Sequence, residues 1–93
     1  MYYQILKQMR DNIRNNDYVM TLHAEEEMDN DNLTIFDIEG VILTGKIIER
    51  QRDQKTTEWK YLIEGITLEN STAVVVAKMS PKNTLVITTV YRI

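Results

Sequence analysis

The spacing of apolar residues changes about half-way along the chain. Up to residue 44 they recur every three or four positions, which places them on one face of a helix. From residue 46 they alternate with polar residues, as in strands with one buried face. A chain of 93 residues has the length of a single domain. The pattern therefore predicts one α+β domain over residues 1–93, mainly helical over 1–45 and an antiparallel β-meander over 46–93.

Three helices are predicted in the first half of the chain. The first lies within residues 2–14, and its apolar face consists of Tyr2, Ile5, Leu6, Met9 and Ile13. A brief extended stretch, residues 18–20, leads to Thr21, the expected N-cap of a short second helix. The turn-forming run 29–32 ends that helix.

The third helix has the clearest boundaries. Thr34 and Asp37 have the spacing of a capping box, and Gly45 is the expected left-handed C-cap. Gly40 lies inside this helix, where glycine costs about 1 kcal/mol relative to alanine. Its presence predicts close packing of another element at that position.

Four strands are predicted in the second half, at about residues 46–52, 59–67, 72–79 and 84–92. Their short connections require antiparallel neighbours, because a parallel crossover needs a dozen residues or more. We therefore expect N-terminal helices packed on a four-stranded antiparallel sheet. In ideal strands Arg50 and Arg52 share a face with Ile48, and Tyr91 shares a face with Ile87 while Arg92 points the opposite way.

Charge is distributed unevenly along the chain. The net charge of −3 and the pI of about 5.1 argue against a nucleic acid as partner. Residues 1–45, however, have a balance of −6, whereas residues 46–93 have a balance of +3. The sheet side of the molecule is thus predicted to be locally basic. The alternative is that these cations only solvate the strands.

Composition also limits location and cofactors. The longest apolar run, residues 73–77, is far below the roughly 20 residues of a membrane span, and the N-terminus lacks the pattern of a signal peptide. We therefore expect a cytoplasmic protein without a membrane partner.

The chain has no cysteine and one histidine, His23, whereas zinc needs three or four protein ligands. Since there is also no phosphate-binding glycine-rich loop, no metal or cofactor is predicted.

Metal-free phosphodiester cleavage needs a proton acceptor for the 2′-hydroxyl and cations that bind the phosphate. His23 is a candidate acid or base near neutral pH, and Tyr91 is a second candidate proton carrier. The candidate phosphate-binding residues are Arg50, Arg52, Lys60, Lys78 and Arg92. The alternative for His23 is a structural role in the first turn of the second helix.

Several short motifs follow one another along most of the chain. They are Thr21-Leu22-His23-Ala24, Met28, Leu33-Thr34, Asp37-Ile38-Glu39, Gly45-Lys46-Ile47-Ile48-Glu49, Tyr61-Leu62-Ile63, the valine strand and Val86-Ile87-Thr88-Thr89-Val90-Tyr91. In this order and spacing, over about residues 18–91, they resemble domain-of-unknown-function family 4258. The His-Ala motif, the Asp-Ile-Glu helix and the Gly-Lys-Ile-Ile-Glu strand are specific only in combination.

The resemblance implies a relation to the RelE-like and BrnT-like toxins of bacterial toxin–antitoxin pairs. These are compact α+β domains that cleave messenger RNA, often on the ribosome, and are silenced by a cognate antitoxin. The resemblance thus implies a RelE-like fold, with cations and a tyrosine of the C-terminal strand near the active cleft. The positions that match catalytic residues are His23 and Tyr91.

The chain departs from the family pattern at two places. Relatives usually carry an arginine where Glu27 precedes Met28, and an Arg-Gly pair where this chain has Asp31-Asn32. Two cations have thereby become carboxylates, which lowers the affinity for a polyanion.

Two functions follow from the sequence. One is a metal-independent endoribonuclease toxin that acts on mRNA. The other is a catalytically inactive module of the same fold that binds a cognate antitoxin or a second copy of itself. A coherent basic cleft around Arg50, Arg52, Lys60 and Arg92 favours the enzyme, whereas scattered cations that pair with carboxylates favour the binding module. No sequence feature supports a small-molecule-binding protein.

Overall fold

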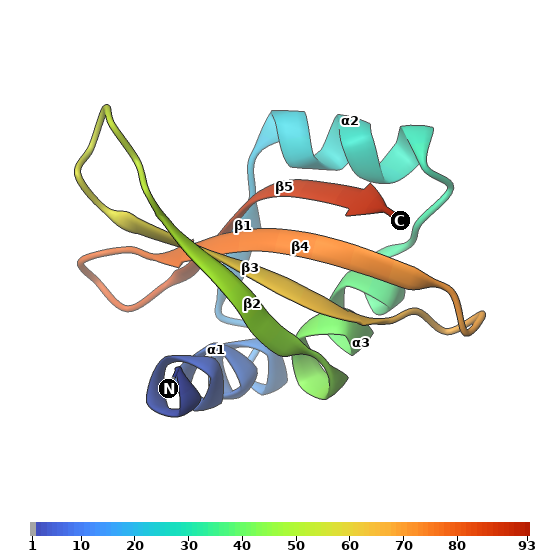
Figure 1. Cartoon of the computed structure of the whole chain (residues 1–93), viewed down its shortest axis with the longest axis horizontal. Coiled ribbons are helices and arrows are strands. Elements are labelled where there is room, and N and C mark those ends of the chain that lie inside the picture. Colours follow the sequence, from blue (N-terminus) through green and yellow to red (C-terminus); the bar gives the residue numbers. More distant parts are fainter. Residues whose placement is uncertain (1) are drawn as a thin grey trace.

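The computed structural model describes residues 2–93 and confirms the α+β class, with helices first and a β-meander after them (Figure 1). The elements are α1 (Tyr3–Arg14), β1 (Tyr18–Met20), α2 (Leu22–Asn30), α3 (Ile35–Thr44), β2 (Lys46–Arg52), β3 (Trp59–Ile66), β4 (Thr72–Met79) and β5 (Leu85–Arg92). Thr21 caps α2 by accepting a hydrogen bond from the Ala24 N–H, as predicted.

The sheet differs from the prediction in the number and direction of its strands. It has five strands in the order β1-β5-β4-β3-β2, and β1 pairs with β5 in parallel, whereas the other pairs are antiparallel. The prediction of a four-stranded, wholly antiparallel sheet is therefore wrong. β1 is only three residues long and its partner lies at the far end of the chain. Its own sequence thus contains no sign of the pairing.

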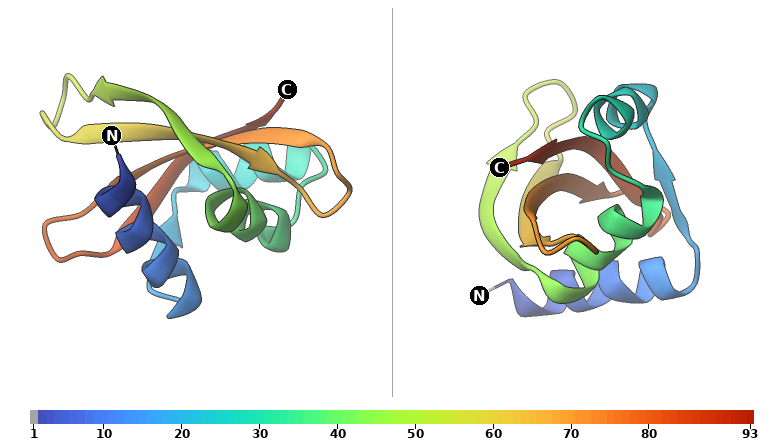
Figure 2. Two further views of the ribbon diagram at one scale, coloured as in Figure 1. Left: turned by 60° about the horizontal axis from the view of Figure 1, so that its bottom comes forward. Right: turned by 90° about the vertical axis from the view of Figure 1, so that its right-hand side faces the viewer.

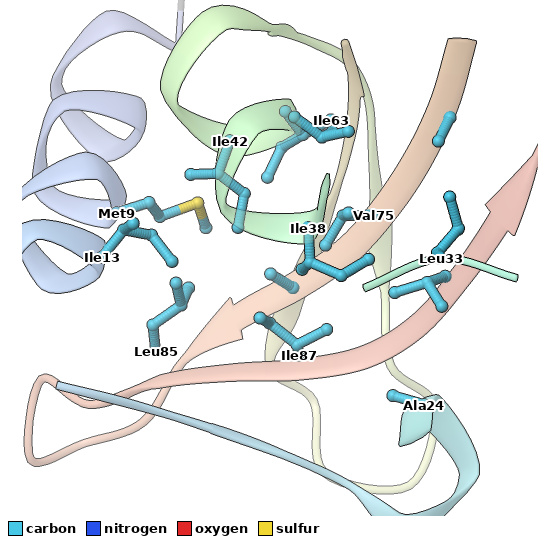
Figure 3. Packing of buried hydrophobic residues seen from close by; sticks show 14 residues of the cluster. Met9, Ile13, Ala24, Leu33, Ile38, Ile42, Ile63, Val75, Leu85 and Ile87 are labelled. Carbon is cyan, nitrogen blue, oxygen red and sulfur yellow. The ribbon is translucent and has the colours of Figure 1, made fainter. Parts of the chain in front are cut away.

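The main core lies between the sheet and the helices α1 and α3 (Figures 1 and 2). Figure 3 shows how apolar side chains from distant parts of the chain meet there, and those it labels on α1, α3 and the strands are Met9, Ile13, Ile38, Ile42, Ile63, Val75, Leu85 and Ile87. We call the face of the sheet that carries Ile63, Val75 and Ile87 the core face. The opposite face carries a small second cluster, Leu62, Val74 and Val76, and we call it the outer face.

Two glycines allow α3 to approach the sheet closely. Gly45 is extended, with φ −87°, so the predicted left-handed C-cap is wrong. A β-carbon at Gly45 would instead meet the backbone oxygens of Val41 and Glu64. A β-carbon at Gly65 would lie 2.6 Å from the Val41 carbonyl oxygen. At Gly40, where close packing was predicted, the nearest such atom is 3.6 Å away, so the close approach lies at Gly45 and Gly65 instead.

The predicted capping box at the start of α3 is confirmed. Thr34 Oγ1 accepts from the Asp37 N–H, and Asp37 Oδ2 accepts from the Thr34 N–H at 2.8 Å. The second carboxylate oxygen accepts from the Leu68 N–H at 2.9 Å. The Thr34 bond, together with the Leu68 bond, lowers the pKa of Asp37 despite its burial. Asp37 thus holds the start of α3 against the β3–β4 loop.

Tyr18 should ionise only at high pH. Burial, followed by the 2.6 Å hydrogen bond to Glu39 Oε2, raises the pKa of Tyr18 to about 12. Because the folded pKa lies above the ordinary value of about 10, the stabilisation by Tyr18 is complete below pH ~10 and is lost as the pH rises through 12. Phenolate absorbance should show a step at about this pH that belongs to Tyr18. A Tyr18→Phe chain that retains this step would contradict the assignment.

Candidate functional site

Helix α2 covers the part of the β5 edge that extends beyond β1. Glu27 Oε1 accepts a hydrogen bond from the Val90 N–H at 3.1 Å, and Asp31 Oδ2 accepts from the Arg92 N–H at 2.9 Å. Four residues separate the two acids, so they lie on one helix face and reach alternate N–H groups of the strand. The two carboxylates that depart from the family pattern therefore satisfy backbone donors at the sheet edge.

His23 lies on the same face of α2, one turn before Glu27. Its Nε2 is 3.3 Å from Glu27 Oε1, and 68% of its side chain is exposed. The oxygen that accepts from the Val90 N–H thus also lies within ion-pair distance of the imidazole. In a neutral imidazole with its hydrogen on Nε2, beside this carboxylate, Nδ1 is the proton acceptor. Sequence reasoning treated Glu27 only as a lost cation, although its spacing of four from His23 was the signal for this pair.

Tyr91 lies on the outer face because of a β-bulge. Ile87 pairs with Ala77, but after a register shift Tyr91 pairs with Val74. The prediction that Tyr91 shares the face of Ile87 is therefore wrong, since a shift of one residue reverses the side of all later side chains. Tyr91 is 38% exposed and follows Val90, whose N–H is bound by Glu27.

Lys60 and Lys78 lie on the outer face as well, each beside a carboxylate of the β2–β3 connection. Lys78 Nζ is 3.0 Å from Glu58 Oε1, and Lys60 Nζ is 4.0 Å from Asp53 Oδ2. The Lys78 hydrogen bond lowers the pKa of Glu58. These two cations therefore reach a phosphate only in competition with Glu58 and Asp53.

Arg50 and Arg52 lie on the core face, near the end of β2 that extends past the buried apolar cluster. A bulge at Ile48 lets Arg50 pair with Tyr61 and Arg52 with Trp59, so the prediction that both arginines share the face of Ile48 in an ideal strand is wrong. Both guanidinium groups stack on the ring of Trp59.

The side chain of Arg92 lies on the core face too, where it fastens the end of α2. Nε and Nη2 donate to the Asp31 carbonyl oxygen at 3.2 and 2.9 Å, and Nη1 donates to Ser71 Oγ at 2.7 Å. A cation at the C-terminal end of a helix also interacts favourably with the negative end of the helix dipole. Arg92 thus joins the α2–α3 connection to the start of β4.

We expect Arg92→Leu to lower the free energy of unfolding by about 2 kcal/mol, because it removes several charge-assisted hydrogen bonds. Arg92→Lys should restore little, since an ammonium group cannot reproduce the planar donor geometry. Urea denaturation measures the effect, and Lys82→Leu, at an exposed turn residue, is the control. Unchanged stability in Arg92→Leu would leave Arg92 free for a ligand.

The candidate residues thus fall into separate groups. Tyr91, Lys60 and Lys78 lie on the outer face, and the His23–Glu27 pair lies beside the β5 edge. Arg50 and Arg52 form a different surface, and Arg92 binds backbone carbonyls. The single basic cleft described by the sequence analysis is not formed by these side chains.

Within residues 2–93, no group of three or more His, Cys, Asp or Glu side chains is placed to hold a metal ion. None of the helices in this range is both long enough and apolar enough to span a membrane.

Comparison with known proteins identifies the family. The model of the family described as Domain of unknown function (DUF4258) matches residues 20–92. The chain belongs to the DUF4258 family. The match covers the DUF4258 core from the end of β1 to the end of β5, including His23, Glu27 and Tyr91, whereas α1 precedes it. Searches of curated proteins and of solved structures each found no match.

Proposed function

We propose that this DUF4258 domain is a metal-independent endoribonuclease, the RelE-like toxin of a toxin–antitoxin pair, which acts on mRNA in the cytoplasm. The observation that carries the proposal is the exposed imidazole of His23, held by Glu27 beside the strand that carries Tyr91. A histidine oriented by a carboxylate is the usual arrangement of a general base.

The chemistry requires one proton acceptor and one proton donor. His23 Nδ1 takes the proton of a ribose 2′-hydroxyl, and the 2′-oxygen then forms a bond to phosphorus as the bond to the 5′-oxygen breaks. The products are a 2′,3′-cyclic phosphate and a 5′-hydroxyl, whose proton comes from the Tyr91 hydroxyl. Lys60 and Lys78 are ion-paired with Asp53 and Glu58 on the outer face, so they bind RNA phosphates only where these carboxylates are displaced.

A second candidate is a catalytically inactive module of the same fold that binds a cognate antitoxin or a second copy of the chain. Its specific support is the distribution of the cations, since Lys60 and Lys78 are paired with carboxylates and the arginines lie on the other face. In this function His23 and Glu27 serve the α2–β5 packing alone.

Induced expression in a bacterial host separates the two functions. If the domain is a toxin, the native chain stops growth and shortens the lifetime of cellular mRNA, and both His23→Ala and Tyr91→Phe relieve the arrest. Glu26→Gln, at an exposed position beside Glu27, is the matched control and should remain toxic. Circular dichroism of each purified chain confirms the fold. Normal growth with abundant, folded native protein would exclude the active toxin and leave the binding module.

A further inference from the structure

The strands β2 and β3 pass the start of α1 (Figure 2). Aromatic and arginine side chains of these elements form one cluster there. The guanidinium carbon of Arg50 is 3.8 Å from the ring centroid of Trp59 and 5.7 Å from that of Tyr2. Arg52 lies 4.7 Å from the Trp59 centroid, and Tyr2 meets Tyr61 edge to face at 5.9 Å. We call these five side chains the aromatic–arginine surface.

This surface continues into an open groove of about 500 Å³ between α1 and the sheet, lined in part by Tyr2, Tyr3, Arg50 and Tyr61. Tyr3 is open to a ligand, since it is 71% exposed, whereas Trp59 is 37% exposed and is stacked by both guanidinium groups. The groove is therefore concave, with aromatic walls and a cation between them.

The charge of this surface is not neutralised. Within residues 2–93 neither Arg50 nor Arg52 forms an ion pair, whereas Lys60 and Lys78 on the outer face each do. A guanidinium stacked on an aromatic ring still presents its N–H donors at the edge, in the geometry that binds phosphate. Aromatic faces, for their part, stack on unpaired bases with little regard to sequence.

We propose that the aromatic–arginine surface and the adjoining groove bind single-stranded RNA. A base stacks on Tyr3 in the groove, and Arg50 and Arg52, held on the Trp59 ring, bind phosphates. Duplex RNA is excluded because its bases already stack on one another and cannot reach the rings. This binding site is separate from the His23–Glu27 pair. This inference rests on the proposed function in one respect, the identification of the bound single strand as RNA.

The position of the surface gives it a role distinct from cleavage. It lies on the core face beside β2, at the opposite end of the sheet from β5. The whole domain measures 32 × 25 × 24 Å, so this surface and the His23–Glu27 pair are less than one domain length apart. Binding at the aromatic–arginine surface thus holds the RNA without specifying the bond that is cleaved.

Trp59 is the chain's single tryptophan, so its fluorescence reports on this surface directly. We would titrate the His23→Ala chain, whose slow cleavage lets binding be measured first, with a short oligouridylate, its DNA analogue and an RNA duplex. Both single strands should quench the fluorescence to saturation, and the duplex should not. A labelled oligonucleotide followed by anisotropy gives a second readout that does not depend on tryptophan.

Arg50→Gln/Arg52→Gln should weaken binding at least tenfold, and the slope of log K against log salt should fall by about 1.4, the contribution of two phosphate contacts on a single strand. Trp59→Leu should weaken binding without changing this slope. Lys7→Gln/Lys82→Gln removes the same charge at exposed positions outside the surface and should change neither.

Three results would overturn the proposal: no binding of single strands, an equal loss in the lysine control, or quenching by polyglutamate in place of the oligonucleotide. The last result would identify an acidic protein as the partner. Because binding is measured without cleavage, a chain that binds RNA but never cleaves it would refute the proposed ribonuclease and leave this site intact.

Discussion

The His23→Ala chain should cleave single-stranded RNA about 10²- to 10⁴-fold more slowly than the native chain, the range that a general base contributes. Within residues 2–93 the imidazole forms one ion pair, with Glu27, and it is 68% exposed, so its removal creates no cavity. The free energy of unfolding should therefore change by less than about 0.5 kcal/mol, as for other surface substitutions. Initial rates on a fluorogenic oligoribonucleotide, with urea denaturation of the same samples, measure both effects.

Glu27 allows a sharper version of this test. Glu27→Gln keeps a side-chain oxygen for the Val90 N–H but removes the charge beside His23. We expect a rate between those of the native and His23→Ala chains, with the fold retained. Glu26→Gln removes the same charge one residue earlier, at an exposed position, and should leave the rate unchanged. Equal rates in the native and His23→Ala chains would eliminate His23 as the base, whatever Glu27 does.

Gly65→Ala should lower the free energy of unfolding by about 3 kcal/mol, at the upper end of the cost of overpacking. The new β-carbon would lie 2.6 Å from the carbonyl oxygen of Val41 and 2.9 Å from its Cα. Both atoms belong to the backbone of α3, so no side chain can rotate away. The helix must move off the sheet, which opens the core around Ile63 and Ile38.

Gly40→Ala is the matched control, and its effect should have the opposite sign. The nearest atom to a β-carbon there, the Ile66 carbonyl oxygen, lies at an ordinary contact distance of 3.6 Å. Alanine inside a helix is favoured over glycine by roughly 0.5–1 kcal/mol, so this variant should be more stable than the native chain. Urea midpoints at constant m value compare the two. A neutral Gly65→Ala would mean that α3 does not approach β3 this closely.

The local signals in the sequence predicted local structure well. Thr21 and the Thr34–Asp37 pair fixed the starts of two helices, because a cap depends on residues three positions away. The parallel pairing of β1 depends instead on a strand at the far end of the chain, and no pattern within three residues can indicate it.

The candidate site was harder to predict than the fold, and for one physical reason. Ideal alternation assigns each strand residue to a face, but bulges in β2 and β5 shift the register in the middle of both strands. Arg50 and Tyr91 therefore each lie on the sheet face opposite to the one that ideal alternation assigns to them. A bulge depends on the neighbouring strand, and the alternating pattern of a single strand does not record it.

The two ends of the sheet restrict how this domain can join another chain. At one edge β1 is short, and the carboxylates at α2 accept the remaining N–H donors of β5, so no further strand can pair there. At the other end β2 contains a bulge and has a net charge of +2, from Lys46, Arg50 and Arg52 against Glu49. Two copies that met through β2 would bring two positively charged strands together, whereas an acidic strand would be attracted. An added strand at this edge is therefore favoured if it comes from an acidic partner and disfavoured if it comes from a second copy of the domain. Salt reduces this preference because it screens the charges.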